Sequence, residues 1–343
     1  MIKYSFNKKI FRILVILFTL FCTIFFISLN QKVHAQLISL SIYPPILKAI
    51  MKPGKEIMIA YNIKNLGDPT TLQMLVLPFE PKDNLGNVRI KEEFEGPIRF
   101  KLDNTNIELN DPIFLKTGQS QQILLRIRVP EGAPEKDYYY TLFAETDPSP
   151  TIEGKTSSRS KARIGSHILI TVTKSGNVDI KGKVSLFSVL GNKLPFFGDK
   201  ISLFDSTDII PITLIVENNG RNSIKPNGEI ILRGNFGERA EYNILSQNIL
   251  AYSQRQLMAT PSAYFSSEKP VSLALSGFFI GKYNLSTKIN FGENTPQLYA
   301  STSFIALPFK FIIGSFIAII VGIVIIRKLN DDKDDKNDEE EEE

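Results

Sequence analysis

Short runs of alternating apolar and polar residues recur through residues 37–306, separated by clusters of Gly, Pro, Asn and Asp. In residues 123–129, an apolar side chain occupies every second position, and two arginines fall on the other face. Side chains two positions apart share one face of a β-strand, so this period predicts strands that are buried on one side. Many short strands between turn signals are typical of an antiparallel sandwich or barrel.

The pattern predicts an all-β fold of two tandem Ig-like antiparallel β-sandwiches. The first covers residues 36–174 and the second residues 175–307, with a boundary near the polar turn at 174–177. Predicted strands of the first are 37–42, 56–64, 71–77, 97–102, 121–129, 138–145 and 166–172. Predicted strands of the second are 183–189, 210–217, 229–233, 241–245, 256–258, 271–275, 282–291 and 298–306. The apolar segment 194–197 fits either the seam between the sandwiches or an exposed patch.

A weak internal repeat supports two copies of one fold. Residues 57–67 align with residues 210–220, and each segment is an alternating strand that ends in Asn-x-Gly. The paired residues Asn65/Asn218 and Gly67/Gly220 predict a turn that needs left-handed backbone. Any two strand-and-turn segments of a β-rich chain share some of these features, so chance similarity is the alternative.

Two apolar segments flank the predicted sandwiches. Residues 1–35 have a basic start, an apolar stretch and a Val-His-Ala site, which predicts a signal peptide cleaved between Ala35 and Gln36. An uncleaved N-terminal anchor is the alternative. Residues 308–328 predict one transmembrane helix. Because the basic pair Arg327 and Lys328 follows the apolar run, the C-terminal end is predicted to be cytoplasmic.

These flanks predict a cell membrane protein with a single span and an extracellular N-terminal ectodomain. The acidic residues 329–343 are predicted to be a disordered cytoplasmic tail that either recruits a basic partner or keeps the C-terminus soluble. The only cysteine, Cys22, lies in the predicted signal peptide, so no disulfide is expected. Such a disulfide-free composition, rich in Ile, Lys and Asn, favours a bacterial source. The ectodomain charge of +4 is too mild for nucleic-acid binding.

The sequence offers little for catalysis or for cofactors. One of its two histidines, His34, lies in the predicted signal peptide, and the other, His167, lies in an apolar strand, where a structural role is expected. No Cys or His cluster predicts a metal site, and no glycine-rich phosphate loop predicts a nucleotide site. The densest carboxylate group, Glu92, Glu93 and Glu95, has the charged surroundings of a solvated surface. We therefore predict no catalytic residues, no metal and no cofactor.

A polar excursion at residues 148–163 is the candidate ligand loop. Its basic residues Lys155, Arg159, Lys161 and Arg163 outnumber its single acid, Glu153. Loops on a rigid scaffold often carry binding residues, and this one would attract an anionic wall polymer. The alternative is a flexible segment that has no partner.

The layout resembles the WxL-interacting type of bacterial surface protein. The local matches are Pro53-Gly54 before an alternating strand, the strand ends at Asn65 and Asn218, and Gly281-Lys-Tyr283 near the last strands. The resemblance implies a first domain that binds peptidoglycan and a second that contacts a partner surface protein.

The leading functional prediction is a non-enzymatic, membrane-anchored surface binding or adhesion protein that contacts a cell-wall polymer or a partner surface protein. The first alternative is a structural or accessory subunit of an envelope complex, such as a secretion or pilus apparatus. A hydrolase with an unrecognised site is the second alternative. Fold class does not separate these functions, because sandwiches host many of them.

Overall fold

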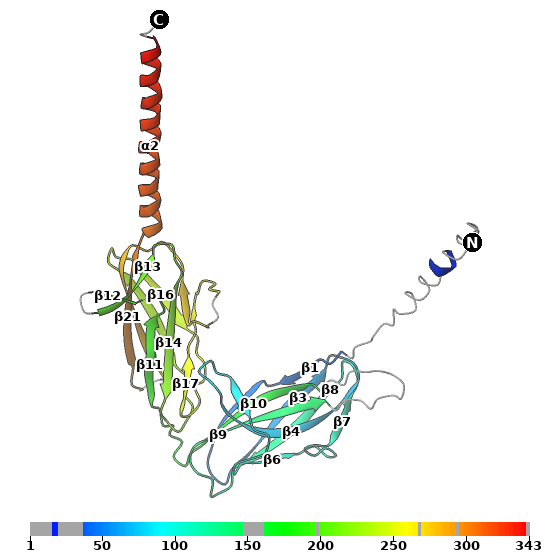
Figure 1. The fold of residues 1–343 in the computed structure, drawn as a ribbon. Coiled ribbons are helices and arrows are strands. Elements are labelled where there is room, and N and C mark those ends of the chain that lie inside the picture. The colour runs from blue at the N-terminus through cyan, green and yellow to red at the C-terminus, as the bar shows by residue number, and fades with distance from the viewer. Residues whose placement is uncertain are drawn as a thin grey trace, which may run out of the picture.

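The computed structural model describes residues 16–19, 37–146, 161–191, 193–196, 199–266, 269–292 and 295–340. Figure 1 shows two pairs of β-sheets that meet at an angle, and a long helix that leaves the far end of the second pair. The chain is therefore mostly β with an apolar C-terminal helix, as the sequence predicts. The predicted signal peptide and its cleavage residues, Ala35 and Gln36, lie outside the described residues, apart from residues 16–19.

The N-terminal sheet pair contains the first ten strands. They are β1 (Leu40–Tyr43), β2 (Ile46–Met51), β3 (Glu56–Asn65), β4 (Thr70–Pro81), β5 (Val88–Ile90), β6 (Arg99–Leu102), β7 (Pro112–Leu115), β8 (Ser120–Arg128), β9 (Asp137–Thr146) and β10 (Arg163–Val172). One sheet has the order β1-β3-β8-β6. The other has the order β2-β10-β9-β4-β5, and β7 also pairs with β4.

The C-terminal sheet pair contains the other strands. They are β11 (Gly182–Val189), β12 (Lys193–Phe196), β13 (Asp199–Asp205), β14 (Ile210–Asn218), β15 (Asn227–Gly234), β16 (Arg239–Ile244), β17 (Ser253–Gln256), β18 (Ala259–Thr260), β19 (Leu273–Leu275), β20 (Gly281–Asn290) and β21 (Leu298–Leu307). One sheet joins β11, β14, β17 and β19. The other has the order β12-β13-β21-β20-β15-β16-β18.

Each sheet pair encloses its own cluster of buried apolar side chains. Ile63 of β3 and Leu142 of β9 come from facing sheets of the N-terminal cluster, and both are fully buried. Leu214 of β14 and Leu285 of β20 occupy the same kind of position in the C-terminal cluster. The alternation of apolar and polar residues in the sequence therefore predicts correctly which face of each sheet is buried. The division into Ig-like domains at 36–174 and 175–307 stays a prediction.

Several short strands are not predicted from the sequence. The sequence pattern does not predict β2, β5, β7, β12, β13 and β18, and the predicted strand 256–258 shares only Gln256 with β17. Most of these strands are short or lie close to a turn, so they show few alternating residues. The apolar segment 194–197 falls partly in β12, at an edge of the C-terminal pair and away from the junction of the two pairs (Figure 1). The seam interpretation of that segment is therefore wrong.

The two sheet pairs repeat one topology, as the weak sequence repeat predicts. In each pair the first strand lies antiparallel to the next long strand, β1 to β3 and β11 to β14. In each pair another early strand runs parallel to the last strand, β2 to β10 and β13 to β21. The aligned sequence segments therefore form the equivalent strands β3 and β14.

The Asn-x-Gly ends of these strands also match in geometry. The Asn65 Oδ1 accepts from Gly67 N at 3.0 Å, and the Asn218 Oδ1 accepts from Gly220 N at 2.9 Å. Neither glycine has a left-handed φ, so the predicted reason for them is wrong. A Cβ would lie 2.1 Å from a backbone oxygen at Gly67 and 2.5 Å at Gly220. Glycine is required because another stretch of backbone passes close by.

The helix α2 (Phe309–Glu340) follows β21 after one proline, Pro308. Its segment Phe309–Arg327 has a mean hydropathy of 2.7 and is long enough to cross a membrane. The helix continues to Glu340, so most of the predicted disordered tail is helical. Once an apolar helix has formed, adding residues to its end costs less than starting a helix, although the Asp and Asn residues that dominate this segment are weak helix formers.

Candidate functional site

The predicted ligand loop does not present four free cations. Lys155 and Arg159 lie outside the described residues. Lys161 Nζ is 2.5 Å from the Glu145 Oε1, and Arg163 Nε donates to the Glu145 Oε2 at 2.5 Å. Glu145 is buried, and the two basic side chains hold its pKa below the usual value against the opposing effect of burial. Lys161 and Arg163 therefore neutralise a buried carboxylate, and their role as ligand contacts stays a prediction.

A different cluster forms where the two sheet pairs meet. Asp137, at the start of β9, is buried and accepts four hydrogen bonds. Its Oδ1 accepts from Asn222 Nδ2 at 2.7 Å and from Thr171 Oγ1 at 2.8 Å. Its Oδ2 accepts from Ser223 N at 2.6 Å and from the Tyr139 hydroxyl at 3.1 Å. Asn222 and Ser223 belong to the C-terminal pair, so one carboxylate joins both pairs.

Further polar contacts cross the same junction. The backbone N–H of Ala251 donates to the Tyr139 hydroxyl at 2.8 Å. Burial, reinforced by the Asp137 charge, raises the pKa of Tyr139 and keeps its hydroxyl protonated. Lys48 Nζ donates to the Asn248 side chain, and burial lowers the pKa of this lysine. Because these bonds attach different strands of one pair to the other pair, they fix the angle of the junction.

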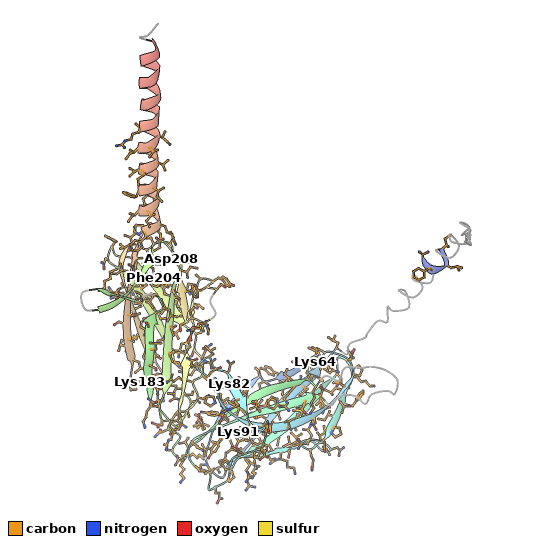
Figure 2. All side chains as sticks on the ribbon, in the orientation of Figure 1. Lys64, Lys82, Lys91, Lys183, Phe204 and Asp208 are labelled. Atoms are coloured by element: carbon orange, nitrogen blue, oxygen red, sulfur yellow. The ribbon has the colours of Figure 1, made fainter. Side chains whose placement is uncertain are left out.

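The hairpin of β4 and β5 makes the third connection. Asp83 caps the turn by accepting from Leu85 N at 2.9 Å and from Asn87 Nδ2 at 2.8 Å. The carbonyl of Asn84 at the tip accepts from Gln256 N of β17 at 2.6 Å. Lys82, labelled in Figure 2, marks where this hairpin approaches the C-terminal pair. Because β4 is long, the turn that follows it reaches across the junction to the C-terminal pair.

An open pocket of about 380 Å³ lies beside these contacts. The N-terminal pair contributes apolar walls, including Phe79 and Leu169, and the C-terminal pair contributes residues 248–250 and 253–255. Its polar lining residues are Asp83, Asn87, His167, Asn248, Ser253, Gln254 and Arg255. A concave site with apolar walls and a few polar groups at a junction is typical of ligand binding.

Arg255 is the unusual group of this pocket. Its Nη1 donates to the Asn248 carbonyl at 2.8 Å, while its Nε is buried and has no partner among the described residues. Burial lowers the pKa of Arg255, and among the described residues no carboxylate forms an ion pair with it. Gly86, with φ of 90°, packs so closely that a Cβ would lie 2.4 Å from the guanidinium carbon. The fold therefore holds at the pocket wall a partly desolvated cation that has no carboxylate partner among the described residues.

His167 of β10 also lines the pocket. Its Nδ1 lies 2.9 Å from the Thr141 Oγ1, and its ring centre lies 4.8 Å from that of Phe79. These contacts agree with the structural role predicted for this histidine, although its place on a pocket was not predicted. Burial lowers its pKa, so the neutral imidazole is favoured in the folded protein.

We expect the stability of the protein to fall as the pH drops from about 7 to about 5, because the unfolded chain protonates His167 more readily than the folded one. The lowered pKa of His167 gives a stabilising contribution that is complete at a pH above the pKa of the unfolded chain. This contribution is lost as the pH falls below that pKa and through the pKa of the folded protein. Urea unfolding across this range should show the loss, and His167→Gln should flatten it. An unchanged slope in that variant would contradict the assignment.

The other sequence candidates occupy ordinary positions. Glu92, Glu93 and Glu95 are exposed, and Glu95 pairs with Lys91 at 2.6 Å. Tyr138 and Tyr140 are buried core residues. Within the described part of the chain, no group of three or more His, Cys, Asp or Glu side chains is placed to hold a metal ion.

Comparisons with known proteins give no family for this chain. No protein-family model matches it, and no curated protein matches it. Among solved structures, it is similar to the class 5 fimbriae chaperone CfaA, with 12% identity, a TM-score of 0.36, and coverage of 78% of this chain and 100% of that one. It is also similar to the E. coli chaperone DraB, with 13% identity, a TM-score of 0.35, and coverage of 77% and 98%. At such TM-scores the likeness supports no functional inference.

Proposed function

We propose that this chain is a non-enzymatic binding protein of the bacterial cell surface, anchored by α2, whose junction pocket takes an anionic group of a cell-wall polymer. The WxL-interacting layout seen in the sequence is compatible with this proposal. The basic pair Arg327 and Lys328 at the end of the apolar helix segment supports an ectodomain outside the cell.

The observation that carries the proposal is the Arg255 guanidinium, which has a buried Nε with no acceptor and no carboxylate partner among the described residues. A planar guanidinium binds carboxylate or phosphate oxygens through parallel hydrogen bonds, and such charge-assisted bonds are stronger than neutral ones. Desolvating a cation without a partner is unfavourable, so a fold that keeps one at a pocket wall favours binding of an anion there. Asp83, the one acid among the residues that line the pocket, accepts hydrogen bonds within its own turn.

We expect Arg255→Gln to weaken binding to labelled poly(glycerol phosphate) about tenfold, because the variant removes one charge-assisted contact. Fluorescence anisotropy of the full-length protein in detergent micelles at low salt measures this affinity. Polyglutamate serves as a second probe and separates phosphate from carboxylate preference. The matched control is Arg239→Gln, which removes an exposed cation already paired with Glu241 at 2.5 Å.

The control decides how the result is interpreted. Affinity that changes little in the Arg239 variant but falls in the Arg255 variant supports the pocket. Equal loss in both variants would mean that only the general charge attracts the polymer, and it would contradict the site. Arg255→Gln also removes the hydrogen bond to the Asn248 carbonyl and the packing against Gly86, so its melting temperature is expected to fall. Circular dichroism should show that both variants are folded at the temperature of the binding measurement.

The fixed junction favours the alternative function as well. An accessory subunit of an envelope complex must present its surfaces at a defined angle, and the buried Asp137 contacts supply one. Chemical cross-linking on intact cells discriminates the two functions. One stoichiometric envelope-protein partner would favour the accessory subunit, whereas cross-links to wall polymer alone would favour the proposed binding protein.

A further inference from the structure

Three chain segments converge at the end of the C-terminal pair from which α2 departs. Ser206 N donates to the Leu307 carbonyl at 3.1 Å, and Phe279 N donates to the Ser206 carbonyl at 2.9 Å. Gly281 pairs with Ala306, so the start of β20 lies beside the end of β21. In Figure 2 the labelled residues Phe204 and Asp208 mark this end.

Large apolar side chains are exposed at this end of the C-terminal pair. Phe236, in the turn between β15 and β16, is 77% exposed, and Phe278 is 64% exposed. Ile280 is also exposed and lies between Phe278 and β20. A Cβ built at Gly281 would lie 3.6 Å from the Phe236 ring, which places this turn beside the start of β20. We call Phe236, Phe278 and Ile280 the juxtamembrane surface.

The length of the apolar helix segment sets the height of this surface above a membrane. Phe309–Arg327 is a segment of 19 residues. At 1.5 Å per residue it measures about 28 Å, close to the roughly 30 Å thickness of a hydrocarbon core. Nearly the whole segment is needed to cross, so Phe309 must lie at the boundary of the hydrocarbon. Groups level with Phe309 then lie among the lipid headgroups.

The sheet pair cannot swing freely away from the helix. The Lys310 backbone N–H donates to the Asp205 Oδ2 at 2.9 Å, and Lys310 Nζ is 2.6 Å from the Asp208 Oδ1. The first of these bonds, followed by a bond from Thr207, lowers the Asp205 pKa to about 2, so this carboxylate stays ionised at neutral pH. With one proline between β21 and α2, these contacts fix the start of the helix against the sheet pair.

We propose that the juxtamembrane surface is a lipid-contact site, in which Phe236, Phe278 and Ile280 insert into the interface of the leaflet that α2 enters. Aromatic and aliphatic side chains at the headgroup boundary bury apolar area without the cost of desolvating charge. The contact holds the C-terminal pair upright on the membrane and sets the orientation of the junction pocket. This inference rests on the proposed membrane anchor.

The absence of tryptophan from the chain allows a direct test. We expect Phe236→Trp and Phe278→Trp, in full-length protein in nanodiscs of phosphatidylcholine and phosphatidylglycerol, to lose roughly half of their emission when lipids brominated near the top of the acyl chains replace ordinary ones. Phe316→Trp, in the apolar helix, reports insertion of the anchor. Tyr252→Trp is the matched negative control, because Tyr252 is 73% exposed and precedes β17 at the other end of the same pair.

The helix reporter separates the two possible failures. Quenching at 316, 236 and 278 with none at 252 supports the lipid contact. Quenching at 316 alone would overturn the juxtamembrane surface while leaving the membrane anchor intact. No quenching at 316 would overturn the anchor, and the lipid contact with it. All four variants retain an aromatic ring, and their circular dichroism should match that of the unchanged protein.

Discussion

Replacing Asp137 with alanine is expected to lower the free energy of unfolding by roughly 3–5 kcal/mol, the largest effect of any single side chain at the junction. The variant removes the acceptor for four donors at once, of which Asn222 Nδ2 and Ser223 N lie in the C-terminal pair. Each buried donor that is left unpaired costs about 1–3 kcal/mol, reduced where water enters. Without these bonds, the angle between the two sheet pairs should also become variable.

Asparagine at this position tests the chemistry more sharply. Asp137→Asn keeps the shape of the side chain. Each carboxylate oxygen of Asp137 accepts two hydrogen bonds, so the amide NH₂ that replaces one oxygen would face donors and could not accept from them. We therefore expect it to destabilise the protein as well. Asp111→Ala is the control, because it removes an exposed carboxylate that accepts only a local bond, from Glu108 N at 2.8 Å. Urea unfolding of the full-length protein in micelles measures stability, and small-angle X-ray scattering measures the angle.

Two results would contradict this account of the junction. If Asp137→Ala cost no more than the Asp111 control, the four bonds would not stabilise the junction. If stability fell but the scattering profile of the folded variant stayed unchanged, the angle would be set by other contacts. The candidates would then be the hairpin bond from Gln256 to Asn84 and the Lys48 contact with Asn248.

The fold was largely predictable because it depends on local periodicity. Ile123, Leu125 and Ile127 recur at every second position, and they form the buried face of β8. The repeat was also visible, although its glycines were interpreted wrongly. A sequence shows that Gly67 and Gly220 tolerate unusual geometry, but it does not show whether backbone conformation or a close neighbour requires them.

The junction could not be predicted because its partners are distant in sequence. Asp137 and Asn222 are 85 residues apart, and Asp137 follows a Pro-Glu-Lys segment that is typical of an exposed turn. Arg255 sits in a short polar strand whose composition indicates a surface edge. The prediction that the basic loop binds anions rests on the charge of the loop alone. Glu145, the acid that Lys161 and Arg163 neutralise, lies in the preceding strand, so a charge count of the loop does not include it.

The repeated asparagine turn offers a test of whether the two sheet pairs are separate domains. Asn218 Nδ2 donates to the carbonyls of Asn222, Ile249 and Leu250 at 2.8, 3.2 and 2.9 Å. Asn65 Nδ2 donates to the carbonyls of Asp68 and Leu115 at 2.8 and 3.1 Å. Both asparagines are fully buried. We expect alanine at either position to cost about 2–4 kcal/mol, because several buried backbone groups lose their partners.

The two variants should nevertheless behave differently. Asn65 adjoins Lys64, which Figure 2 places at the end of the N-terminal pair away from the junction, so Asn65→Ala should weaken that pair alone. Hydrogen exchange should then rise in β3, β8 and β9 while β14 and β20 stay protected. Asn218 holds the carbonyl of Asn222, whose own side chain binds Asp137, so Asn218→Ala should weaken the C-terminal pair and the junction together. Because Asn218 and Asp137 share that partner, the double variant should cost less than the sum of the single ones. Exchange that rises equally in both pairs for Asn65→Ala would mean that the ectodomain unfolds as one unit.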